Sequence, residues 1–148
     1  MIYLGSDHRG FRKKTKLVKF LEKNHYEFED LGPKKYDKSD DYNDSAIAVS
    51  RAVQKSAADF GILLCGSAHG MVIQSNRFQK IRAVTATEKK LVQLAREHND
   101  ANILCLSADF LSSKKIRQLV QTFLGTNFTP AERLVRRNRR LDDKENYA

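Results

Sequence analysis

A cysteine in a glycine-rich turn is the strongest chemical signal in the sequence. The segment Leu64–Met71, LCGSAHGM, follows an apolar run and precedes a short amphipathic stretch. Such a strand–turn–helix junction directs backbone N–H groups outward, where they favour an anion. The start of the helix is expected to lower the pKa of Cys65 and hold a thiolate. On these residues alone, a buried structural thiol at a strand end stays open as an alternative.

The glycine spacing of this turn excludes two common nucleotide-binding motifs. No Gly-Lys-Ser/Thr triplet follows, so the turn is not a P-loop. The GxGxxG spacing of a dinucleotide-binding fingerprint is absent as well. The sequence therefore favours a different kind of anionic ligand at this turn.

Two further polar segments carry groups that suit a charged, hydroxylated ligand. The segment Gly5–Gly10, GSDHRG, follows the first apolar run and places Asp7 and His8 beside each other. Its alternative role is a helix cap with a solvated histidine. The segment Arg96–Asn102, REHNDAN, contains His98, which can act as an acid or base near neutral pH. Its alternative role is a polar helix C-terminus that interacts favourably with the helix dipole.

The C-terminal tail is strongly basic. Arg133 and Arg137 are four residues apart, so on a helix they share a face and could clamp one phosphate. A solvated helix and a nucleic-acid-binding surface are the alternatives. Only one aromatic residue, Tyr147, lies in the tail, well past the arginines, and no recognition motif accompanies it.

Short apolar runs alternate with longer amphipathic stretches and must position these groups. Five strands are predicted near residues 2–4, 26–31, 60–64, 81–84 and 103–106, with helices between them. This alternation predicts a parallel sheet with helices on both faces. Ligands of such sheets bind at the carboxyl ends of the strands. We therefore expect the site to lie in three places, namely after Leu4, after Leu64 and around residues 99–106.

Composition restricts the class of protein. A chain of 148 residues with 41% hydrophobic content can bury the core of one domain. The charge sum, 27 − 18 = +9, favours an anionic partner without identifying it. Two cysteines suit a reducing cytosol. No apolar run approaches the ~20 residues of a membrane span, and the N-terminus does not resemble a signal peptide.

Taken together in chain order, the polar segments resemble those of the B-type ribose-5-phosphate isomerases. The matching motifs are GSDHxGF, DYxD, CGSxxGM and REHNDAN, followed by spaced arginines. The likeness covers nearly the whole chain, and its HNDxN and CG segments are the most specific. This family, which includes galactose-6-phosphate isomerase subunits, interconverts an aldose phosphate and a ketose phosphate through an enediolate without a metal.

The resemblance implies three catalytic residues. Cys65 would move a proton between C1 and C2, and Ser67, at a position that is usually Thr, would assist this base. His98 would open the sugar ring. The backbone N–H groups of the turn would bind the enediolate oxygens, where negative charge develops. The turn residues concerned are Gly66, Ala68, His69 and Gly70.

The resemblance also implies the other substrate-binding residues and the assembly. These residues are Asp7 and His8 in the first loop, Tyr42 in the DYxD segment, Asn99 beside His98, and Arg133 and Arg137 as a phosphate clamp. No cofactor or metal is implied. The sites of the family are shared between two subunits, so a homodimer or tetramer is expected.

Besides Ser67, four positions depart from the family pattern. The usual Gly-Ile pair in the turn is replaced by Ala68 and His69, and we hypothesise that His69 touches the pocket or the dimer interface. Asp109 stands where a ligand arginine is common, so that phosphate contact is expected to be lost or replaced. Leu134 stands where histidine is common. Arg9 is close enough to the first loop to help attract phosphate.

We therefore predict a single α/β domain over residues 1–148, a Rossmann-like three-layer sandwich with a five-stranded parallel sheet. Residues 129–148 are predicted to form a basic C-terminal extension that contains a helix and packs at the dimer interface. The predicted function is cytoplasmic isomerisation of ribose 5-phosphate and ribulose 5-phosphate. The alternatives are the same chemistry on a hexose 6-phosphate, such as allose or galactose 6-phosphate, and a non-catalytic protein that binds nucleic acid. We expect no membrane partner and do not expect nucleic acid to be the ligand.

Overall fold

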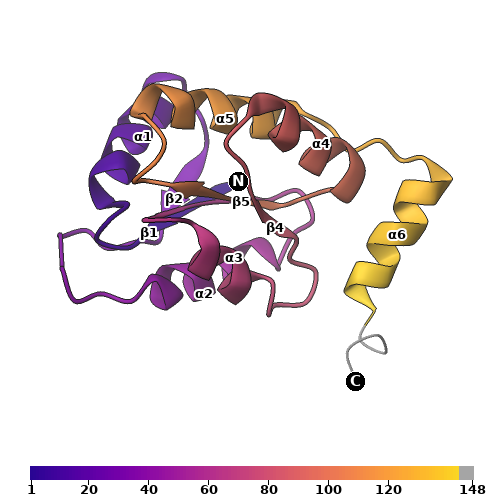
Figure 1. The fold of residues 1–148 in the computed structure, drawn as a ribbon, viewed down its shortest axis with the longest axis horizontal. Coiled ribbons are helices and arrows are strands. Elements are labelled where there is room, and N and C mark those ends of the chain that lie inside the picture. Colours follow the sequence, from indigo (N-terminus) through magenta and orange to yellow (C-terminus); the bar gives the residue numbers. More distant parts are fainter. Residues whose placement is uncertain (144–148) are drawn as a thin grey trace.

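A computed structural model describes residues 1–143 of the chain. Five parallel strands form one sheet in the order β2-β1-β3-β5-β4 (Figure 1). The strands are β1 Ile2–Ser6, β2 Phe28–Asp30, β3 Phe60–Cys65, β4 Ala83–Thr85 and β5 Ile103–Ser107. The predicted parallel sheet is confirmed, and every predicted strand is present within a few residues of its expected bounds.

Helices cover both faces of the sheet. One face carries α1 (Phe11–Lys23), α4 (Lys89–Asn99) and α5 (Ser113–Gly125), and the other carries α2 (Tyr42–Val53) and α3 (His69–Ser75) (Figure 1). Each face has its own apolar core, because the side chains of a strand alternate between the two sides of the sheet. The predicted three-layer α/β arrangement is therefore confirmed.

A sixth helix, α6 (Glu132–Asp142), stands apart from these layers (Figure 1). Most of its residues, including all of its arginines, are exposed, and only Leu134 and Asn138 are buried. The predicted basic C-terminal helix is thus present over these residues. The part of the predicted extension that spans 144–148 lies outside the described residues.

One polar residue in the apolar stripe of α1 has a structural explanation. Lys14 is only 2% exposed, and its ammonium group donates to both carboxylate oxygens of Asp30 at 2.7 and 2.6 Å. It also donates to the Pro33 carbonyl at 3.1 Å. Burial of this lysine is tolerated because its charge is paired and its donors are used. The ion pair ties α1 to the end of β2 and to the loop that follows it.

Candidate active site

The first loop and the cysteine turn meet at the carboxyl ends of β1 and β3. These two central strands lie side by side, with Ser6 paired to Leu64, and the Asp7 N–H donates to the Leu64 carbonyl at 3.2 Å. The chain leaves β1 and β3 for helices on opposite faces of the sheet, which is where open α/β sheets bind ligands. The predicted proximity of Asp7 to Cys65 is therefore confirmed.

The environment of Cys65 differs from the expectation for a helix N-terminus. Cys65 is 5% exposed, and its sulfur accepts a hydrogen bond from the Ala68 N–H at 3.2 Å. Burial raises the pKa of Cys65, the charge of Asp7 raises it further, and backbone N–H groups of the turn counteract these effects only in part. The expectation of a lowered pKa is wrong, because desolvation outweighs the backbone donors of the turn.

The turn itself is strained at one position and closely packed at another. Ala68 has a φ of 73°, in the left-handed region that alanine rarely adopts. The strain arises because this position, which is usually glycine in the family, is occupied by alanine. A Cβ on Gly70 would lie 2.5 Å from the ring of Tyr42, so only glycine lets this ring pack against the turn. Tyr42 therefore lies against the cysteine turn, whereas the side chains of Ser67 and His69 are exposed.

The first loop is held by two carboxylates. Asp7 accepts a hydrogen bond from the Gly10 N–H at 2.9 Å, and burial raises the pKa of its carboxyl group. Asp40 accepts from the backbone N–H of His8 at 2.9 Å and contacts its ring nitrogen Nδ1 at 2.7 Å. Asp40 thereby holds the His8 ring in place through Nδ1. Sequence analysis did not single out Asp40, because 32 residues separate it from His8 and only the fold brings them together.

The remaining predicted residues lie at the opposite end of the sheet, where the amino ends of the strands meet. His98 and Asn99 end α4 and precede β5, and the Gly61 N–H at the start of β3 donates to the Asn102 carbonyl at 2.8 Å. Cys65 is four residues beyond Gly61 in β3, so the amino and carboxyl ends of this strand are about 13 Å apart. The expectation that this segment lies with Cys65 is wrong within one chain, because α4 returns to the amino ends of the strands.

Several contacts fix the end of α4 that carries His98. Asp100 has a φ of 45° and accepts from the Arg96 guanidinium at 2.8 Å, which closes the turn after the helix. The Asn138 side chain of α6 donates to the His98 carbonyl at 3.1 Å. Arg133 and Arg137 are exposed on α6, each one residue before a buried position. The helix that carries these two arginines is therefore bound to the end of α4 that carries His98.

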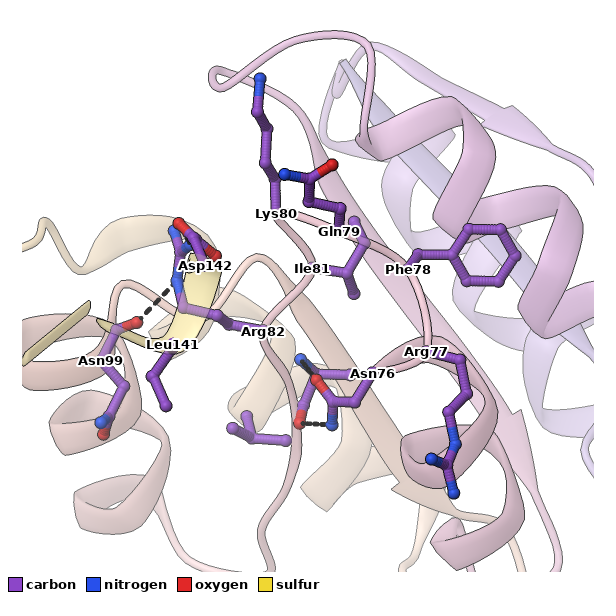
Figure 2. A pocket seen from close by; sticks show the side chains of 12 residues that line it. Asn76, Arg77, Phe78, Gln79, Lys80, Ile81, Arg82, Asn99, Leu141 and Asp142 are labelled. Atoms are coloured by element: carbon purple, nitrogen blue, oxygen red, sulfur yellow. Dashed lines mark hydrogen bonds and ion pairs between the residues drawn. The ribbon is translucent and has the colours of Figure 1, made fainter. Parts of the chain in front are cut away.

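A cavity of about 660 Å³ lies beside this second group of residues. Figure 2 shows that Arg82 reaches between Asn99 and Asp142 at its wall. Arg82 donates to the Asn99 carbonyl at 2.9 Å and to the Asp142 carboxylate at 3.0 Å, so it joins α4 to the end of α6. Cys65 does not line this cavity, which therefore holds no complete catalytic site.

Arg82 and Asn138, like Asp40, were missed by sequence analysis. Each acts through a backbone carbonyl or a distant carboxylate, and no local motif marks such a role. Within residues 1–143, no cluster of three or more His, Cys, Asp or Glu side chains is arranged to hold a metal ion. In that same part of the chain, no helix combines the length and apolar character needed to cross a membrane.

Comparisons with known proteins agree with this geometry. Residues 2–142 match the family model described as Ribose/Galactose Isomerase. A probable ribose-5-phosphate isomerase B from Mycoplasma pneumoniae is 37% identical over 127 residues, which covers 86% of this chain and 84% of that protein.

Solved structures are similar over almost the whole chain. The ribose 5-phosphate isomerase of Thermotoga maritima has a TM-score of 0.90 at 40% identity, covering 95% of this chain and 96% of that one. The ribose-5-phosphate isomerase B of Mycoplasma genitalium, solved with bound ribulose-5-phosphate, has a TM-score of 0.93 at 34% identity. That match covers 99% of this chain and 97% of the other.

Proposed function

This chain belongs to the ribose/galactose isomerase family, and from that membership we propose that it interconverts ribose 5-phosphate and ribulose 5-phosphate. The similar proteins carry the name ribose-5-phosphate isomerase B, and one was solved with the ketose phosphate bound. The hexose 6-phosphate alternative is not favoured, because these relatives are named for the pentose. The nucleic-acid alternative has no similar support.

The observation that carries the mechanism is the position of Cys65. It ends a central strand at the edge where the first loop arrives, with its sulfur 3.2 Å from the Ala68 nitrogen. In the proposed reaction the Cys65 thiolate removes the proton at C2 of the open-chain aldose and returns it to C1, while the hydroxyl proton of the C2 oxygen moves to the C1 oxygen. Ser67 assists this base from the same turn. The enediolate carries negative charge on its oxygens between these two proton transfers.

Backbone donors supply the second part of the mechanism. The turn residues Gly66, Ala68, His69 and Gly70 are proposed to direct N–H groups at the enediolate oxygens. Fixed donors of this kind stabilise charge that develops in the transition state, and they do not have to reorganise. Asp7, His8 and Tyr42 surround the same turn and are proposed to hold the sugar hydroxyl groups.

The third part must come from a second copy of the chain. His98 is proposed to open the sugar ring and Asn99 to bind its oxygens, while Arg133 and Arg137 clamp the phosphate. Within one chain, the segment of His98 and Asn99 meets the amino end of β3, about 13 Å along the strand from Cys65. The helix that carries the two arginines is bound to this same segment through Asn138. A site that contains both groups needs two subunits, so we propose a homodimer or a tetramer with shared active sites.

We propose that the described chain acts as a single domain and that residues 129–143 contact the partner subunit. The apolar and arginine-rich surfaces of α6 support this role, because few of its residues pack on their own chain. The phosphate bound by α6 would supply binding energy far from the reacting carbons. The proposed reaction uses no cofactor and no metal.

Isomerase assays test this function directly. Purified protein is given ribose 5-phosphate, and ribulose 5-phosphate is measured with and without EDTA. The expected result is saturable activity that EDTA leaves unchanged. Cys65→Ala is expected to lower kcat by roughly 10³-fold, since a positioned base contributes roughly 10²–10⁴-fold. Cys105→Ala is the matched control, because Cys105 is fully buried in the core.

If the folded oligomer had no activity on the pentose phosphate, the proposal would be refuted. Six-carbon sugar phosphates would then be tested as substrates. Activity that survives Cys65→Ala would refute the assigned base. Loss of activity in EDTA that added divalent metal restores would refute the metal-independent mechanism. Steep salt-dependent binding to nucleic acid, unaffected by Cys65→Ala, would instead support the non-catalytic alternative.

A further inference from the structure

An ion pair bridges the first loop and the loop after β5, directly above the cysteine turn. The Arg9 guanidinium donates to the Oδ2 atom of Asp109. A Cβ built on Gly66 would lie 2.8 Å from Arg9 Nε and 3.1 Å from Asp109 Oδ2. The pair therefore rests on the backbone of the residue that follows Cys65, at the mouth of the proposed site.

The carboxylate of this pair is held in a fixed place. Three hydrogen bonds connect the loop that carries Asp109 to the cysteine turn. The Gly66 carbonyl accepts from Ser107 Oγ at 2.6 Å and from the Asp109 N–H at 3.2 Å. The Ala108 N–H donates to the Cys65 carbonyl at 2.7 Å. The Lys13 ammonium group adds a bond to the Ala108 carbonyl. Asp109 is thus an anchor whose position is fixed relative to Cys65.

The Arg9 guanidinium keeps N–H donors that its ion pair with Asp109 does not use. A guanidinium group has five N–H donors, and Asp109 is the hydrogen-bond acceptor that the described residues offer Arg9. The Arg9 side chain is 57% exposed, so its outer edge is open to a ligand. Asp109 is an acid and repels an anion by itself, but a guanidinium anchored on one edge can bind phosphate with the other.

We propose that Arg9 binds the phosphate group of the sugar phosphate and that Asp109 is its positioning residue. This inference rests on the proposed function and deepens it. It explains how the Cys65 side of the site supplies a cation although position 109 is an acid. The arginines of α6 would then contact the phosphate from the partner, and Arg9 from the subunit that carries the base.

Steady-state kinetics of Arg9→Ala test this role against a purely structural one. Arg12→Ala is the matched control, because Arg12 is an exposed arginine on α1 that takes no part in the site. We expect Arg9→Ala to raise KM for ribose 5-phosphate roughly 10- to 100-fold, with kcat changed by less than about threefold. The inhibition constant of inorganic phosphate should rise in parallel. Isomerisation of unphosphorylated ribose should be unchanged, because that substrate lacks the group that Arg9 binds.

Variants of Asp109 separate anchoring from direct contact. Asp109→Asn should raise KM by less than Arg9→Ala, roughly three- to tenfold, because the guanidinium stays but loses its fixed position. The double variant Arg9→Ala/Asp109→Arg should recover most of the lost affinity, since it returns a guanidinium group to the same place. Failure of this rescue, with the folded oligomer intact, would contradict the assignment of this spot to phosphate.

Equal KM values for Arg9→Ala and Arg12→Ala would overturn the inference. So would an equal loss of efficiency with ribose and with ribose 5-phosphate. If the wild-type protein does not isomerise ribose 5-phosphate, the proposed function fails on its own. Calorimetric binding of inorganic phosphate to wild type and Arg9→Ala then still decides this inference, with weaker binding by the variant supporting it and equal binding refuting it.

Discussion

The side-chain amide of Asn138 on α6 donates a 3.1 Å hydrogen bond to the backbone carbonyl of His98 on α4. Forty residues separate them in sequence, yet this bond fixes the basic helix relative to the end of α4. The carboxylate of Asp142 on α6, bound by Arg82, adds a second tie between the same elements. The end of α4 that carries His98 and the arginine-rich helix α6 are therefore bound together, at the opposite end of the strands from Cys65.

A shared site predicts complementation between two inactive variants. Cys65→Ala lacks the base and His98→Gln lacks the ring-opening group, so each homodimer should be inactive. A mixed dimer has one site with both defects and one site with neither. Random mixing should therefore restore about a quarter of wild-type activity, because half of the dimers are mixed and half of their sites are intact.

Co-expression of the two variants with different affinity tags provides the measurement. The doubly tagged fraction is isolated and its kcat per site is compared with wild type. A co-expressed pair of Cys65→Ala and Cys65→Ser is the control and should stay inactive. Absence of activity in the purified mixed dimer would place both groups in one chain and contradict the shared site.

The raised pKa of Cys65 predicts that its thiolate forms mainly above pH 9. Its folded-state pKa is above the ordinary value of 9.0, so a fall in pH through the neutral range removes the remaining thiolate. Isomerase activity should accordingly rise with pH from acid through neutral conditions. Ultraviolet thiolate absorbance of wild type minus Cys65→Ala measures this titration. A midpoint below pH 8 would contradict the burial argument.

Asp7→Asn should shift that titration toward lower pH. The negative charge of Asp7 is one of the causes that raise the pKa of Cys65, and the amide removes it. The amide oxygen can still accept from the Gly10 N–H, so the loop is retained. Asp41→Asn, a change in an exposed carboxylate beyond the turn, is the control and should leave the midpoint unchanged. An unchanged midpoint in Asp7→Asn would remove Asp7 from the list of causes.

Asp7→Asn should also stabilise the folded protein at neutral pH. Burial raises the pKa of Asp7 above its unfolded value of 3.8, so folding favours the protonated form. The stability that protonation provides is complete below the unfolded pKa and is lost as pH rises through the folded pKa. The variant should therefore gain free energy of unfolding over wild type at pH 7, with the gain shrinking toward pH 4.

Urea unfolding at the two pH values measures this difference. Asp37→Asn is a control of opposite sign, because hydrogen bonds from Ser39 lower the pKa of Asp37. Its carboxylate adds stability above the unfolded pKa, so the variant should lose stability at pH 7. A gain for Asp7→Asn that is as large at pH 4 as at pH 7 would indicate a cause other than ionisation.

The buried ion pair of Lys14 and Asp30 predicts a large stability loss when one member is removed. Lys14→Met keeps the apolar length of the side chain but leaves the Asp30 carboxylate without its main partner. The expected cost is roughly 3 kcal/mol in urea unfolding, since breaking a buried pair strands a charge. Lys16→Met, on the exposed side of the same helix, should change stability by less than about 0.5 kcal/mol. Similar values for the two variants would show that the pair contributes little.

The periodicity of the sequence determined the architecture. Short apolar runs such as residues 60–64 have the composition of strands buried on both faces, and the stretches between them have helical spacing. A parallel sheet with helices on both faces follows from that alternation alone. The sequence also shows which polar side chains follow the two central strands. These side chains lie close together because the carboxyl ends of parallel strands meet at one edge of the sheet. Asp7 and Cys65 were therefore predictable neighbours.

Only the tertiary structure decided which groups act together. No local motif shows at which end of the strands His98 lies. Its position follows from the direction in which α4 returns to the sheet. Contacts such as Asp40 with His8, Arg9 with Asp109 and Asn138 with His98 join segments 32 to 100 residues apart. The pKa of Cys65 likewise depends on burial, which a local motif cannot encode. The sequence specifies the local periodicity and the chemical groups, whereas packing decides the desolvation and the distances on which their chemistry depends.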